Sequence, residues 1–82
     1  MSALDELHAR LAATRVKLAE ATEHTNRAVE LLTEAEQAFV AAHDQAEPWL
    51  PPQLAGALEQ TTADVNRLSA ADTLLSGYEA SL

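Results

Sequence analysis

Three histidines are the residues of this chain best suited to bind a metal ion. His8, His24 and His43 lie 16 and 19 residues apart. Glu20 precedes His24 by four residues and Glu47 follows His43 by four, so each pair could share a ligand on one helical face. The Glu-x-x-His spacing of di-iron helical bundles is absent. We therefore interpret the histidines as solvated side chains, and rank a metal- or ligand-binding bundle last of three functional alternatives.

The sequence also lacks the arrangements that enzymes use for covalent and acid–base catalysis. It has no cysteine, no Gly-rich phosphate-binding loop and no serine in a strand-to-helix elbow. The carboxylates of Glu30, Glu34 and Glu36 do not fall on the inward face of a helix. We expect a protein that is not an enzyme and that needs no cofactor.

A long helix positions these side chains, because a heptad repeat runs through the first 46 residues. Its positions, spaced alternately by three and four, are Leu4, Leu7, Leu11, Thr14, Leu18, Ala21, Thr25, Ala28, Leu32, Ala35, Phe39, Ala42 and Ala46. This spacing keeps one apolar seam on one face of the helix, and such a seam requires a partner helix.

Proline and glycine divide the chain into two helices within a single domain, residues 1–82. The first helix is predicted over about 3–46, with a capping box at Ser2 and Asp5, and the second over about 52–77. Gly77 is expected to end the second helix, which leaves 78–82 as a tail. The turn, residues 47–52, contains Pro48, Trp49, Pro51 and Pro52. Trp49 is predicted to close the turn end of the hairpin, over Phe39 and Leu54. The alternative is that Trp49 anchors an interface, since Trp is favoured in interface hot spots.

The second helix carries a seam of its own. Its positions are Leu54, Leu58, Thr61, Val65, Leu68, Asp72 and Leu75. Two amphipathic helices joined by a short turn predict an all-α, antiparallel helical hairpin. Where the two helices overlap, small residues at Ala21, Ala28, Ala35 and Ala42 predict a close approach of the backbones.

The unequal helix lengths predict an uncovered stretch. The first helix spans ~66 Å and the second ~38 Å, so the second reaches only to about residue 20 of the first. Leu4, Leu7, Leu11 and Leu18 are then exposed, and we predict that they form an interface. The partner is a second copy or another helical protein, and the product is a four-helix bundle or coiled coil.

A three-helix bundle is the structural alternative. Residues 22–26 are the weakest helical segment of the first helix, and Thr25 or Asn26 could cap a new helix there. The N-terminal leucines would then be buried within one chain. No glycine or proline supports this break, so the hairpin is preferred.

Charge narrows the range of partners. Residues 1–29 carry four basic and four acidic groups, whereas the other 53 residues hold nine acids and only Arg67. This excess of acid disfavours nucleic acid and anionic membrane surfaces. No apolar run is long enough for membrane insertion, and no Sec-type signal peptide opens the chain. We expect a cytoplasmic protein, unless a non-Sec route that accepts folded helices exports it.

A short, Ala-rich, cysteine-free, acidic hairpin with a single Trp in its turn resembles the WXG100-type small proteins of actinobacterial type VII secretion. It is also similar to the short hairpin domains that actinobacteria encode beside polymorphic toxins. Trp49 and Tyr78 carry the resemblance. Trp49-Leu50-Pro51 stands in place of Trp-x-Gly, and Leu82 in place of the acidic residue of a Tyr-x-x-x-Asp/Glu tail. The resemblance implies paired hairpins in four-helix bundles, export in the folded state and delivery of a toxic partner.

We therefore predict a dimerising interaction module that serves as an adaptor or targeting partner in a type VII-like secretion or toxin-delivery system. The alternative is an intracellular coiled-coil scaffold or an antitoxin-like regulator.

Overall fold

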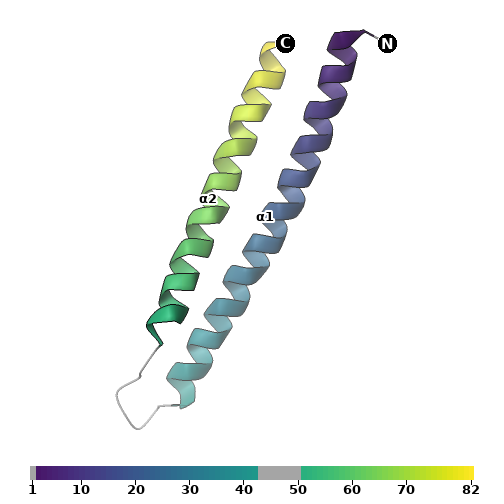
Figure 1. Ribbon diagram of the computed structural model, residues 1–82. Helices are drawn as coiled ribbons and strands as arrows, with labels where there is room; N and C mark the ends of the chain where they lie inside the picture. Colours follow the sequence, from purple (N-terminus) through teal and green to yellow (C-terminus); the bar gives the residue numbers. More distant parts are fainter. Residues whose placement is uncertain (1, 43–50) are drawn as a thin grey trace.

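The chain is an antiparallel hairpin of two helices. A computed structural model describes residues 2–42 and 51–82, in which α1 runs over Ala3–Ala42 and α2 over Pro52–Ser81, and these residues form no strand. The helices lie side by side with both termini at one end, as Figure 1 shows. The molecule is a rod of 67 × 16 × 15 Å. The predicted all-α hairpin is thus confirmed.

The N-terminus of α1 is capped as its sequence predicts. The Asp5 amide donates a hydrogen bond to Ser2 Oγ at 3.1 Å, and the Glu6 amide donates to the Ser2 carbonyl at 3.1 Å. The bond to Ser2 Oγ satisfies an amide of the first turn that has no backbone partner, and the Glu6 bond is the first backbone bond of the helix. The predicted continuation of the helix from residue 43 to 46, and the turn residues Pro48 and Trp49, lie outside the described residues.

The alternative of a break near residues 22–26 is wrong, because α1 is continuous through this segment. The Thr22 hydroxyl donates to the Leu18 carbonyl at 2.8 Å, and the Thr25 hydroxyl donates to the Ala21 carbonyl at 2.7 Å. A threonine that bonds back to the preceding turn does not cap a new helix. Both side chains are also half-buried on the face that packs against α2.

The second helix begins as predicted but ends later. Pro52 is its first residue, and the Pro51 carbonyl accepts the Leu54 amide at 3.0 Å. The helix then continues through Gly77 to Ser81, so the expected end at Gly77 and the tail at 78–82 are wrong. Glu79 supplies a physical reason, because its side chain pairs with Arg15 of α1 and holds the last turn against the first helix.

The two seams meet along the hairpin. The seven predicted seam positions of α2 are all half-buried, as are most of those of α1. Within residues 2–42 and 51–82, Leu11 is the only buried side chain, at 9% exposure, and none is completely shielded from solvent. The buried stripe of α1 is also wider than the seam, since it includes the residues that follow every second seam position. These half-buried residues are His8, Arg15, Thr22, Val29 and Glu36.

Candidate functional site

The four N-terminal leucines predicted as an interface lie at the open end of the hairpin. Leu11 is buried, Leu7 and Leu18 are half-buried, and Leu4 is 48% exposed. The expectation that α2 stops short of all four is wrong, because α2 is about one turn longer than predicted and lies beside Arg15. Of the four, Leu4 alone is an exposed apolar side chain.

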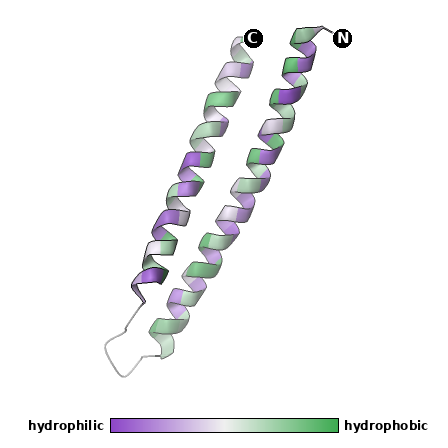
Figure 2. Cartoon of the chain, in the orientation of Figure 1, coloured by the Kyte–Doolittle hydropathy of each residue, from purple (hydrophilic) through white to green (hydrophobic). Residues whose placement is uncertain are grey.

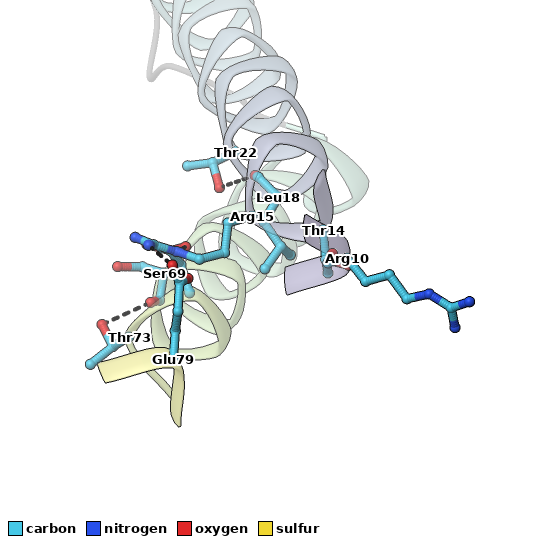
Figure 3. Close-up of polar contacts among 9 residues, drawn as sticks. Arg10, Thr14, Arg15, Leu18, Thr22, Ser69, Thr73 and Glu79 are labelled. Carbon is cyan, nitrogen blue, oxygen red and sulfur yellow. Dashed lines mark hydrogen bonds and ion pairs between the residues drawn. The ribbon is translucent and has the colours of Figure 1, made fainter. Parts of the chain in front are cut away.

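Arg15 joins the two helices at this end. Its Nε donates a hydrogen bond to Asp72 Oδ1 at 2.9 Å, and its Nη1 lies 3.5 Å from Glu79 Oε2. Figure 3 shows Arg15 directed toward α2, whereas Arg10 points away. Asp72 and Glu79 are seven residues apart and therefore share one face of α2. Glu79 Oε2 is buried and accepts no hydrogen bond, but it forms the ion pair with Arg15.

This cluster perturbs the ionisation of its members. The Arg15 guanidinium lowers the pKa of Asp72 below its ordinary value of 3.8, mainly through the hydrogen bond and further through its positive charge, while partial burial opposes the shift. The same hydrogen bond raises the pKa of Arg15. The charged forms of both groups are therefore the ones that the hairpin stabilises.

The lowered pKa of Asp72 predicts an acid-sensitive contribution to stability. A carboxyl with a depressed folded pKa stabilises the fold fully above its unfolded pKa, here 3.8, and loses this effect as the pH falls through the folded value. Thermal unfolding followed by circular dichroism from about pH 7 to pH 2 should show a loss of stability below about pH 4 that Asp72→Asn reduces.

The matched control for this titration is Asp64→Asn. Asp64 pairs with Arg67 within α2, at a spacing of three, and links no second helix. An identical pH dependence for Asp72→Asn and Asp64→Asn would contradict a specific role for Asp72.

An open groove runs along the flank of the hairpin that contains the ion pairs. It has a volume of about 880 Å³, and its lining includes Ala12, Val16, Ala19, Glu23, Arg27 and Ser69 beside the Arg15 cluster. Its lining combines charged side chains of both signs with apolar ones. Neither a nucleophile with an adjacent base nor a Gly-rich phosphate cradle occurs among its lining residues.

The histidines do not form a metal site in the part of the chain that the structure describes. His8 is half-buried, His24 is exposed, and His43 lies outside the described residues. No three His, Cys, Asp or Glu side chains of segments 2–42 and 51–82 come together as a metal site would require. Neither α1 nor α2 contains a stretch long and apolar enough to cross a membrane.

Large apolar side chains remain exposed on both helices. Apart from Leu4, they are Val16, Leu31, Val40, Leu74, Tyr78 and Leu82. Leu74 is the most exposed of them, at 75%, although it lies well inside α2. None of these residues was predicted to belong to an interface. The signal that could have identified Leu74 is the absence of charge around it, since Asp72 is the only charged residue between Arg67 and Glu79.

The chain matches no known family model, no curated protein and no solved structure. Its function is therefore inferred from the residues and geometry of the hairpin.

Proposed function

We propose that this chain is a non-enzymatic interaction module, a helical hairpin that associates through its helices with a second copy or a related hairpin. The observation that carries the proposal is the thinness of the core, in which Leu11, at 9% exposure, is the single buried residue of the described part. Two helices packed along one seam each keep an unpaired surface, and further helices are what such surfaces bind.

The accessible surface of the chain supports the same proposal. It amounts to 6050 Å² for a mass of 8.8 kDa. A compact monomer of this mass exposes about 4,800 Å², so the hairpin exposes roughly 1,300 Å² more. A standard protein interface covers about 800 Å² on each partner. The excess reflects the rod shape of a single hairpin, and pairing with a second rod would reduce it.

The absolute mass in solution tests this proposal. Light scattering behind a sizing column, over a hundredfold range of concentration, should give a dimer or a larger species, together with a strongly helical circular dichroism spectrum. A monomer at every concentration would contradict self-association. A related hairpin would then be the remaining partner. Co-purification of the chain from its host would be the experiment that identifies this partner.

We further propose an adaptor or targeting role in secretion by a type VII-like system. The resemblance of the hairpin to type VII-associated small proteins supports this role, with Trp49 and Tyr78 as the residues that carry it. Detection of the protein in culture filtrate, with an intracellular marker absent, is the expected result. Retention in cells that contain the protein would instead favour the intracellular scaffold or antitoxin-like regulator.

A further inference from the structure

We infer that a second copy of this chain docks on an uncharged strip of α2 made of Ala71, Leu74, Tyr78 and Leu82, so that two hairpins meet through their terminal halves. This inference rests on the proposed function and identifies the surface that it uses.

The four strip residues share one face of α2, because they are spaced by three, four and four. Leu74 is 75% exposed, Tyr78 51% and Leu82 42%, whereas Ala71 is half-buried at the edge of the seam. In Figure 2 the C-terminal part of α2 has fewer deep purple bands than its N-terminal part. Leu74 and Tyr78 are thus the members of the strip that this chain leaves at least half exposed.

The strip and the groove lie on opposite flanks of the hairpin. Ala71 and Tyr78 each precede a half-buried residue, Asp72 and Glu79, whereas the groove residue Ser69 follows the seam residue Leu68. Residues before and after a seam position lie on opposite sides of the contact line between two helices. A partner on the strip therefore leaves the Arg15 cluster undisturbed.

Charge favours a second copy as the occupant. In a twofold contact the same patch of both copies meets, so that residues near the axis face themselves. Like charges that face each other are unfavourable, and residues 30–82 hold nine acids against Arg67. Over residues 68–82, by contrast, the acids are Asp72 and Glu79, and both are paired with Arg15. The strips of two copies can therefore pack against each other without bringing carboxylates into opposition.

The neighbouring part of α1 is also compatible with a twofold contact. Residues 1–29 hold four acidic and four basic groups, in balance, and their exposed members include the pairs Arg10–Glu6 and Lys17–Glu20. Two copies that overlap in antiparallel fashion at their terminal halves bring these mixed charges together. The acidic excess then lies in the two turn-side halves, which point away from each other.

The first test is Leu74→Glu, with Val16→Glu as the matched control. Val16 is also more than half exposed, lies on the groove side and belongs to no part of the strip. Leu74→Glu should weaken self-association by ~100-fold or more, because it places a carboxylate opposite its own copy in an apolar contact. Val16→Glu should leave the association constant within about threefold of the natural chain, measured by sedimentation equilibrium.

The second test does not depend on the folding of a charged variant. The natural chain has no cysteine, so Leu74→Cys and Val16→Cys each introduce a single thiol. Under mild oxidation Leu74→Cys should give a covalent dimer and Val16→Cys should not, because a disulfide requires Cα atoms within about 7 Å. The cross-linked species should keep the helical spectrum of the natural chain.

The outcomes separate this inference from the proposed function. If the natural chain dimerises but Leu74→Glu dimerises equally and Leu74→Cys does not cross-link, the strip is not the interface, and the interaction module still stands. If the natural chain is monomeric at every concentration, self-association fails and the strip has no second copy to bind. Loss of assembly in Leu74→Glu with retained helicity, together with cross-linking at position 74, supports the inference.

Discussion

Leu11→Ala should lower the free energy of unfolding by about 2–3 kcal/mol, toward the low end of the cost of truncating a buried leucine. Leu11 is 9% exposed and is the most buried side chain of the described residues. In a two-helix rod Leu11 has few neighbouring side chains, so its truncation loses fewer contacts than in a larger core and leaves no closed cavity, which places the cost toward the low end. Urea denaturation followed by circular dichroism at fixed protein concentration measures the change.

The control for Leu11→Ala is Val16→Ala, which truncates an apolar side chain that is 57% exposed on the same helix. A surface truncation of this kind is expected to change the free energy of unfolding by no more than about 0.5 kcal/mol. Equal effects of the two substitutions would show that Leu11 is not packed against α2 in solution. That result would restore the expectation that α2 stops short of the N-terminal leucines.

The hairpin itself could be predicted from the sequence because its determinants are local or periodic. The 3.5-residue spacing defined the seam, and every predicted seam position of α2 is half-buried. The cap at Ser2 follows from a hydroxyl directly before an apolar helix, and Pro52 suits a first helical turn because it lacks an amide hydrogen. The cap and the first helical turn each depend on residues that lie within a few positions along the chain.

The end of α2 could not be predicted in the same way, because a tertiary contact overrides a local preference. Glycine favours helix ends, and the rule placed the end at Gly77. In the structure, Glu79 pairs with Arg15 of α1, and the helix continues to Ser81. One signal was present in the sequence: the alternating spacing continues from Leu75 to Glu79 and Leu82.

The buried side of α1 was predicted too narrowly for a similar reason. A strict heptad reading selects two positions in seven, but a helix in a small bundle buries a third. Arg15 follows the seam residue Thr14 and is half-buried, while Thr14 is exposed. Only the position of α2 reveals that the buried stripe is shifted toward Arg15, and this shift is what brings the guanidinium to Asp72 and Glu79. The sequence contains Arg15, Asp72 and Glu79, but the heptad spacing does not predict that they form an ion-pair cluster.

The continuity of α2 through Gly77 can be tested by adding one methyl group. Gly77→Ala should raise the free energy of unfolding by ~0.5–1 kcal/mol, because alanine loses less backbone entropy than glycine in a helix interior. A Cβ built at Gly77 meets no atom within 4 Å, so no steric cost opposes the gain within the chain. Thermal and urea unfolding at one protein concentration measure it.

Gly56→Ala is the matched comparison, since Gly56 also lies inside α2 and its added Cβ also meets nothing within 4 Å. The two substitutions should stabilise the hairpin by similar amounts, and the double variant by about 1–2 kcal/mol, since residues 21 positions apart contribute independently. A gain at Gly56 without a gain at Gly77 would mean that α2 ends near Gly77 in solution. Glu79 would then be too mobile to hold Arg15, and removing its carboxylate by Glu79→Gln would leave stability unchanged.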